Sequence, residues 1–308
     1  MTGPEEEGLS GSQWATARAR FRRHVRSPRP PIWIELLVIG WMCWLYDYIN
    51  NFSPLRIGEA FSNGRFLLQF EQTLHLDPEA SLDHWVAHHP NVGYVAGTYY
   101  DNLHFVATLG LIAFLWWRFP ARYRPLRNGL VLTNVCAMII FWLVPTAPPR
   151  LLDPSRYIDI VALSNSFGSW HSGTLGTAAN QLAAMPSMHL GWATWCAIAV
   201  WRIAPEKWWR WSVLLYPALT AVVVMATGNH YLTDVVAGII VAAAAQLVAD
   251  RWTGWWATRQ ARHALQADAR ARARADARAR ADAHADAGNR ASGSDVTRGA
   301  PVRQPGQV

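Results

Sequence analysis

Six apolar stretches separated by polar segments constrain what this chain can fold into more than any other feature of its sequence. They cover residues 32–49, 95–117, 128–144, 187–203, 211–227 and 231–249. A helix crosses the hydrocarbon core of a bilayer with about 20 apolar residues, and about 17 is the lower limit. Because lipid offers no hydrogen-bond partners, a spanning segment must satisfy its backbone internally, as a helix does. The sequence therefore predicts an all-α, polytopic membrane bundle of about six transmembrane helices.

The two ends of the chain differ from this apolar middle. Residues 1–31 are basic and lack the apolar core of a cleavable signal, so we expect the first span to remain as an anchor. Residues 261–287 alternate Ala with Arg, Asp and His, which is typical of a low-complexity segment, with a solvated helix as the alternative. The expected domains are a cytoplasmic basic segment, 1–31, a membrane domain, 32–250, and a low-complexity cytoplasmic tail, 251–308.

Basic residues are distributed unevenly between alternate connections. Arg and Lys concentrate in residues 18–29, 118–127 and 202–210, whereas residues 50–92 and 145–186 carry at least as many acidic side chains as basic ones. Short loops rich in Arg and Lys stay in the cytoplasm. We therefore expect a multi-pass protein of the cell membrane with both termini cytoplasmic and the two long loops outside. Basic residues placed this way argue against nucleic-acid binding, which needs them on a folded, water-facing surface.

The first outer loop, residues 50–92, contains a helix start. Residues 77–79 read Asp-Pro-Glu, which combines a capping side chain, a proline for the first helical position and an acid for the first turn. Leu82, Trp85 and Val86 follow at spacings that place them on one face, which suggests a helix on the membrane surface. Packing against the bundle and closing over a site are both open for this helix.

Three clusters of polar and proline residues stand at the ends of predicted spans. Residues 145–150 read Pro-Thr-Ala-Pro-Pro-Arg, residues 185–189 read Met-Pro-Ser-Met-His, and residues 228–234 read Gly-Asn-His-Tyr-Leu-Thr-Asp. Polar groups at such positions are costly to desolvate and indicate function. Under the topology above, all three clusters reach the same outer face of the membrane, so we expect them to form one site.

The residue types in these clusters suit phosphoryl transfer. His230 and Asp234 are four apart on one helix face, where the carboxylate fixes the imidazole tautomer and leaves the other nitrogen as a nucleophile. Ser187 is a candidate N-cap whose helix terminus binds an anion, and His189 in the first turn is a candidate general acid. Arg150 offers a planar fork for phosphate oxygens. The sequence lacks the spacings typical of zinc sites, so we expect neither a metal nor another cofactor.

This pattern resembles the type-2 phosphatidic acid phosphatase superfamily, whose members have six helices and three motifs. Those motifs are Lys-x6-Arg-Pro, Pro-Ser-Gly-His and Ser-Arg-x5-His-x3-Asp, and the matching positions here are Arg150, residues 186–189, and His230 with Asp234. The resemblance covers residues 32–250 and implies that this is a catalytic domain. It also implies that His230 forms a phosphohistidine, that Asp234 orients it and that His189 is the acid.

The chain departs from that family pattern at several basic positions. Leu143 stands where the family has lysine, Leu151 replaces the proline, and residues 223–224 are Val-Val instead of Ser-Arg. The His-Tyr-x-x-Asp element at 230–234 is similar to that of the branch containing inositol phosphorylceramide synthases and sphingomyelin synthases, which move a phospho-headgroup between lipids. Candidates to replace the missing cations are Arg56, Arg65, Arg156 and His171.

Asp101 and His104 introduce polar groups near the outer half of the second span. Ionisable residues inside a membrane domain either pair with one another or mark a functional site. We favour mutual pairing within the bundle interior, with a place in the substrate cleft as the alternative.

Two functions from different classes fit these observations. The first is a membrane phosphatase or phosphotransferase that acts on a lipid phosphoester, with water or a lipid alcohol as acceptor. The second is a catalytically inactive binder or carrier of phospholipid headgroups on the same fold. Retention of His189, His230 and Asp234 together favours the enzyme, because binding alone needs no paired acid and nucleophile.

Overall fold

The structure is a computed structural model that describes residues 29–52, 56–164, 181–204 and 207–295. The described residues are helical or irregular, and their one β-type feature is an isolated parallel bridge between Thr146 and Ala183. The helices are α2 Ile32–Phe52, α3 Ile57–Thr73, α4 Glu79–Ala87, α5 Pro90–Thr98, the π-helix η1 Tyr99–Leu103, α6 His104–Arg118, α7 Pro120–Leu143, α8 Pro149–Leu152, α9 Ile160–Ser164, α11 Met188–Ile203, α12 Lys207–Ser212, α13 Leu215–Ala226 and α14 Leu232–Asp295. The predicted all-α fold class is confirmed.

The helix bounds differ from the predicted spans where polar residues continue a helix. α7 begins at Pro120, which occupies the first helical turn, so Arg122, Arg124 and Arg127, expected in a loop before residue 128, lie on the helix itself. α14 continues through the Ala/Arg/Asp tract to Asp295, because Ala and Arg are among the strongest helix formers. The solvated helix left open for this tract is what the structure shows. The chain forms two compact units, residues 1–251 and 252–308.

Other spans are interrupted. The fifth is divided into α12 and α13 by a turn at residues 213–214. The second runs through α5, η1 and α6 without a break, and the π-helix adds wider turns between Tyr99 and Leu103. Single π turns inside α-helices occur frequently at functional sites.

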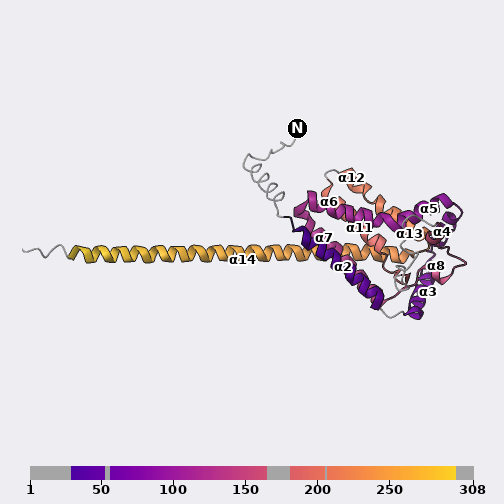
Figure 1. The fold of residues 1–308 in the computed structure, drawn as a ribbon, viewed down its shortest axis with the longest axis horizontal. Coiled ribbons are helices and arrows are strands. Elements are labelled where there is room, and N and C mark those ends of the chain that lie inside the picture. Colours follow the sequence, from indigo (N-terminus) through magenta and orange to yellow (C-terminus); the bar gives the residue numbers. More distant parts are fainter. Residues whose placement is uncertain (1–28, 53–55, 165–180, 205–206, 296–308) are drawn as a thin grey trace, which may run out of the picture. The chain divides into compact units, whose positions relative to one another are not determined.

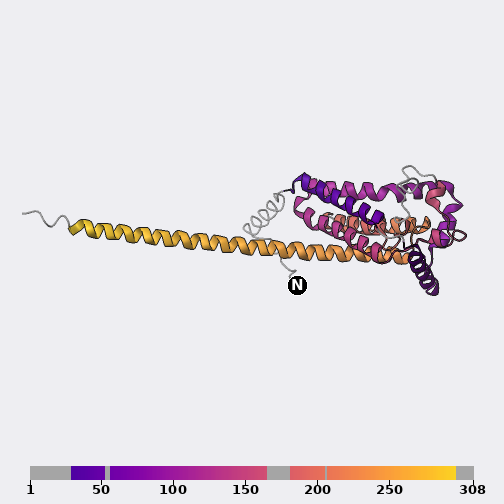
Figure 2. The ribbon, with the colours of Figure 1, turned by 60° about the horizontal axis from the view of Figure 1, so that its bottom comes forward.

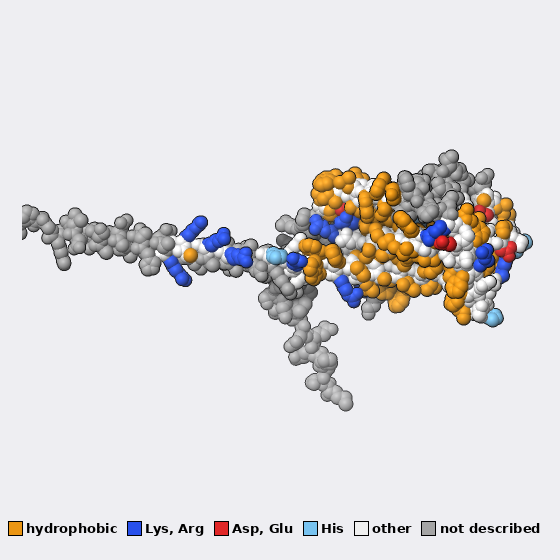
Figure 3. Space-filling view, turned by 90° about the horizontal axis from the view of Figure 1, so that it is seen from below, with side chains coloured by type: hydrophobic (Ala, Val, Ile, Leu, Met, Phe, Trp, Pro, Cys, Tyr) orange, Lys and Arg blue, Asp and Glu red, His pale blue; other side chains and the backbone are white. Residues whose placement is uncertain are grey.

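Apolar side chains cover the flank of the bundle. α7 and residues Leu232–Gln260 are long and apolar enough to cross a membrane. Shorter apolar stretches are Ile32–Met42 within α2 and Arg210–Ala226, which includes the end of α12 and all of α13. Figure 3 shows hydrophobic side chains over the flank, with charged ones mostly toward the ends. Exposed large residues come from several helices and include Trp33, Leu37, Val106, Leu109, Ile139, Leu215, Leu219 and Ile240. An exposed apolar surface of this extent is typical of contact with lipid.

Helices α3, α4, α5 and α8 lie together at one end of the bundle (Figures 1 and 2). Val86 of α4 packs against Ile160 and Ala226, so the helix is part of this end of the bundle. Trp85 of the same helix is exposed. The predicted capping arrangement is wrong, because Pro78 is itself the N-cap and no side chain caps the helix. The carboxylate of Asp77 accepts instead from Arg156 at 2.6 Å.

Candidate active site

Backbone hydrogen bonds join the three polar clusters at this end of the bundle. Thr146 N donates to Leu182 O at 2.7 Å, and Thr146 O accepts from Ala184 N at 3.1 Å, which fastens the first cluster to the loop before α11. Arg150 N donates to Gly228 O at 3.1 Å, and Ser187 N donates to Asp234 O at 3.1 Å. Segments far apart in the sequence are therefore held in one place by main-chain contacts.

His230 is buried and held by two acceptors. Its Nδ1 lies 2.9 Å from the backbone oxygen of Ala184 and 3.4 Å from Oδ2 of Asp234. A carbonyl oxygen accepts only, so Nδ1 carries the proton and Nε2 is the basic nitrogen. Oδ2 of Asp234 also accepts from Tyr231 N at 3.0 Å. The contact with Ala184 O is the shorter of the two. The ring of His230 is therefore held by this carbonyl as well as by Asp234, which was expected to orient it alone.

His189 faces His230 across the site. Their ring centroids are 5.8 Å apart at an interplanar angle of 65°. Nε2 of His189 donates to the backbone oxygen of Tyr100 at 3.1 Å, and the Tyr100 ring stacks on it at 4.2 Å. Tyr100 belongs to the π-helix η1, so this irregular turn places both the carbonyl and the ring against His189.

The His104 ring also lies beside His189, with ring centroids 4.3 Å apart. It belongs to the first turn of α6, directly after η1, and it is half-buried. Asp101 is buried within η1 itself. The position of His104 supports the alternative in which this polar pair borders the site.

Ser187 occupies the predicted N-cap position of α11, but its side chain makes no capping hydrogen bond. The residue is buried, and among the described residues its Oγ has no hydrogen-bond partner. A buried hydroxyl without a partner costs free energy, which a ligand oxygen at the helix terminus offsets. The geometry therefore fits a phosphate contact better than a helix cap.

The first turn of α11 and the second turn of α14 approach each other closely at Gly238. A Cβ at this position would lie 2.4 Å from Ser187 O and 3.2 Å from Cβ of Leu190. Both neighbours flank His189, and Gly238 is one turn beyond Asp234 on α14. The absent side chain thus permits the spacing between the two histidine-bearing segments, as small residues do in membrane bundles.

Arg150 lies in the first cluster and is largely buried. Its Nε donates to Oδ2 of Asp159 at 3.0 Å, and its side chain is 8% exposed. Gly228 approaches it with φ of +66°, and a Cβ there would meet Ile158 O at 3.0 Å and Cβ of Arg150 at 3.4 Å. Glycine is required at this turn both by the left-handed backbone and by the close packing.

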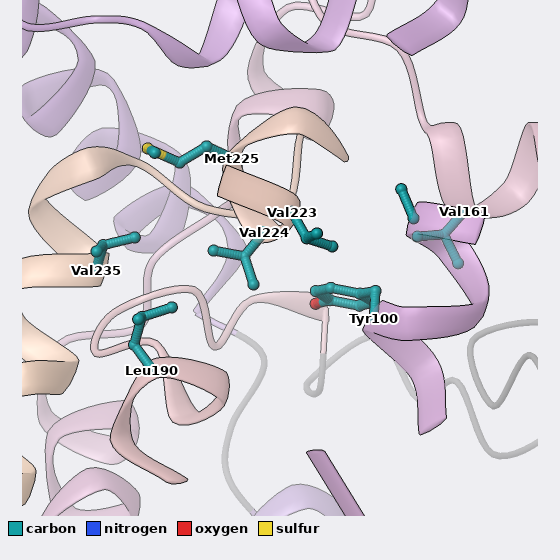
Figure 4. Packing of buried hydrophobic residues seen from close by; sticks show 8 residues of the cluster. Tyr100, Val161, Leu190, Val223, Val224, Met225 and Val235 are labelled. Carbon is teal, nitrogen blue, oxygen red and sulfur yellow. The ribbon is translucent and has the colours of Figure 1, made fainter. Parts of the chain in front are cut away.

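Apolar side chains occupy the positions where the resemblance leads us to expect cations. Val224 is fully buried beside Tyr100, Leu190 and Val235 (Figure 4). Leu143 is 66% exposed at the end of α7. Neither position delivers a charge to the site.

Two of the four candidate replacement cations are paired with other side chains. Arg156 pairs with Asp77, and Arg56 pairs with Glu59 at 2.9 Å. Arg65 is exposed on α3, and His171 lies outside the described residues. Within the part of the chain that the structure describes, no group of three or more His, Cys, Asp or Glu side chains is arranged to hold a metal ion.

Asp83 fastens α4 to the loop that carries Asp159. Both of its carboxylate oxygens lie within hydrogen-bond distance of Ile158 N, at 2.8 and 3.0 Å, and the residue is fully buried. Burial raises the pKa of the Asp83 carboxyl from 3.8 to about 6, although the Ile158 N–H opposes the shift. The folded protein therefore holds this proton at pH values where the unfolded chain has released it.

Replacement of Asp83 by Asn should flatten the pH dependence of stability. Between pH 4 and 6 the folded wild type binds more protons at this site, so its free energy of unfolding falls as pH rises, by up to about 3 kcal/mol. Apparent Tm in detergent, measured across this window, should fall less steeply in Asp83→Asn. Asp153→Asn is the control, because the Ser155 hydroxyl lowers the pKa of Asp153 and moves its titration below the window. Equal slopes for wild type and Asp83→Asn would contradict the assignment.

Sequence reasoning missed three groups that hold the site: the backbone oxygens of Ala184 and Tyr100, and the carboxylate of Asp159. A backbone carbonyl that accepts a hydrogen bond from a histidine ring cannot be recognised from residue identity. Asp159 lies nine residues after Arg150 in an irregular segment. Neither the helical nor the strand period predicts that two residues at this spacing are in contact.

A family model described as PAP2 superfamily matches residues 65–248, a range that contains all the residues of the three clusters. Comparisons with curated proteins and with solved structures gave no significant match.

Proposed function

The chain belongs to the PAP2 superfamily, and we propose that it cleaves or transfers a lipid phosphoester through a phosphohistidine formed on His230. Membership of the superfamily supports phosphatase- or phosphotransferase-type activity in general. The observation that carries the specific mechanism is the 2.9 Å contact between His230 Nδ1 and Ala184 O. It fixes the tautomer in which Nε2 has a free lone pair for attack on phosphorus.

The proposed reaction has two steps. In the first, Nε2 of His230 bonds to phosphorus as the bond from phosphorus to the leaving oxygen breaks, and His189 donates a proton to that oxygen. In the second, His189 accepts a proton from water or an alcohol, whose oxygen attacks the phosphohistidine and restores free His230. Asp234 and the Ala184 carbonyl stabilise the positive charge that develops on the His230 ring. Arg150 and the unpartnered Ser187 hydroxyl are the proposed phosphate contacts.

The site is proposed to face the outside of the cell. The clusters lie at the bundle end formed by α3, α4, α5 and α8. α3, α4 and α8 belong to the two long connections, in which acidic side chains are at least as numerous as basic ones, whereas residues 118–127 carry arginines without acids. Because arginine-rich short connections stay in the cytoplasm, this assignment places both termini inside.

Within the superfamily, the inositol phosphorylceramide synthase-like branch is the proposed relationship. The support is the His-Tyr-x-x-Asp element at 230–234 together with the apolar residues at 143 and 224. Tyr231 is fully buried, and its hydroxyl donates to Ala147 O at 2.9 Å, so this tyrosine joins the first and third clusters. A lipid alcohol is then the expected acceptor, with water as the competing one.

A headgroup binder without turnover is the second candidate. It is favoured by one observation, the burial of Val224 in an apolar cluster where the family has arginine. Loss of that cation weakens stabilisation of the transition state more than it weakens binding of the ground state.

Turnover of a substrate panel by purified protein in proteoliposomes separates these candidates. Lipid phosphomonoesters and phosphodiesters are each supplied with and without a lipid alcohol, and free phosphate and new phosphorylated lipids are quantified separately. We expect a new lipid product that depends on the added alcohol. Free phosphate alone would identify a phosphatase. No product from any substrate, with retained binding of the same lipids, would contradict the enzyme and support the binder.

A further inference from the structure

Asp159 lies in the outer loop and holds Arg150 in a fixed orientation. Its Oδ2 accepts from Arg150 Nε at 3.0 Å, while its Oδ1 accepts from Ala162 N at 3.0 Å in the first turn of α9. The residue before it, Ile158, is fastened to Asp83 on α4. Each carboxylate oxygen therefore has a defined partner, and the backbone on which the carboxylate stands is fixed as well.

This contact determines which part of the guanidinium faces a ligand. An arginine side chain has five N–H donors, and Nε supplies one of them. With Nε bound to Asp159, the two Nη groups remain as the fork that binds phosphate oxygens in pairs. Arg150 N is bound to Gly228 O at 3.1 Å, so the backbone and the side chain of Arg150 are both held. Asp159 is thus a positioning residue for Arg150.

The same contact lowers the positive charge offered to a substrate. The carboxylate of Asp159 lies 3.0 Å from the charge that Arg150 supplies. Arg156 and Arg56, in the same outer connections, are already paired with Asp77 and Glu59. A phosphomonoester carries close to two negative charges near pH 7, whereas a phosphodiester carries one. Among the described residues of the candidate site, Arg150 therefore has its charge partly balanced by this carboxylate, which disfavours the second negative charge of a monoester.

We propose that Asp159 is a specificity-determining residue, which positions Arg150 and balances its charge so that the site takes monoanionic phosphodiester headgroups over dianionic phosphomonoesters. This inference rests on the proposed function. It assigns the choice of substrate class to the charge balance of the Arg150–Asp159 pair.

The test compares kcat/KM for two lipids with the same acyl chains, a phosphatidylinositol as the phosphodiester and a phosphatidic acid as the phosphomonoester. The ratio is measured at about pH 7.5, where the monoester is a dianion. Wild type should prefer the phosphodiester. Asp159→Asn and Asp159→Ser remove the charge and keep a residue suited to the N-terminus of α9. In both variants the ratio should move toward the phosphomonoester, on the order of tenfold, because the extra negative charge no longer faces a carboxylate.

Two control variants separate charge from structure. Asp159→Glu keeps the charge and should keep the wild-type ratio even where total activity falls. Asp153→Asn removes a carboxylate from the same loop that accepts from Ser155 and Arg156, and it should leave the ratio unchanged. An unchanged ratio in both neutral Asp159 variants overturns the inference. Turnover of neither lipid by wild type would overturn the proposed function itself, which is a distinct result.

Discussion

Replacement of His230 by Ala should abolish turnover, with a loss of at least about 10³-fold in kcat, while the protein still inserts and folds. The side chain is buried and held by Ala184 O and Asp234, and its removal takes away the proposed nucleophilic nitrogen. A replaced general acid slows a reaction less, typically by about 10²–10⁴-fold. His189→Ala should therefore retain more activity than His230→Ala on a substrate with a good leaving group, which needs little protonation.

The measurement is a single-turnover assay with the preferred lipid, in which the acid-labile phosphohistidine is trapped and quantified. Wild type should accumulate label on the protein, and His230→Ala should accumulate none. His88→Ala is the matched control, because this histidine is exposed and its Nδ1 contacts only the backbone oxygen of His84 in the described structure. Label retained in His230→Ala would move the nucleophile to another residue and end the proposed mechanism.

A single methyl group at Gly238 should impair the site without touching any reacting group. In Gly238→Ala the new Cβ meets Ser187 O at 2.4 Å, a backbone atom that cannot rotate away. The first turn of α11 must therefore move from α14, which separates His189 from His230. Overpacking of this kind costs about 1–3 kcal/mol, and a displacement near 1 Å costs about 10²-fold in rate.

Apparent Tm and kcat/KM of Gly238→Ala are compared with those of Gly110→Ala. Gly110 lies on α6 with nothing within 4 Å of its Cβ position, so the same substitution there should leave activity unchanged and raise helix stability. Both quantities should fall in Gly238→Ala. Full activity with an unchanged Tm would show that the two helices are not in the close contact described.

The convergence of the three clusters could be predicted from sequence because a membrane limits the arrangements of a chain. Once spans and charge bias fix the direction of each helix, the ends at residues 150, 189 and 230 reach one side. The residue types that suit phosphoryl transfer could be recognised in these clusters from the sequence as well. The fold class followed from apolar length alone, since lipid excludes every unpaired backbone group.

Other features depended on contacts that sequence patterns do not encode. The π-helix that brings Tyr100 to His189 has no distinctive composition, and its residues read as an ordinary part of a span. The prediction that Asp77 caps a helix was wrong, because its carboxylate accepts a hydrogen bond from Arg156, which is 79 residues away in the sequence. α7 began earlier than expected because a proline in the first turn is compatible with a helix even when arginines follow.

The main-chain hydrogen bonds between the clusters also bear on how such a site diversifies. Contacts such as Thr146 N to Leu182 O and Ser187 N to Asp234 O depend on backbone groups that every residue except proline possesses. Side chains around the candidate site can therefore be substituted while the backbone hydrogen bonds that align His189 and His230 are kept. The geometry of the site and its selectivity therefore depend on different atoms. Substitution of side chains can alter which substrate the site accepts while the backbone contacts stay in place.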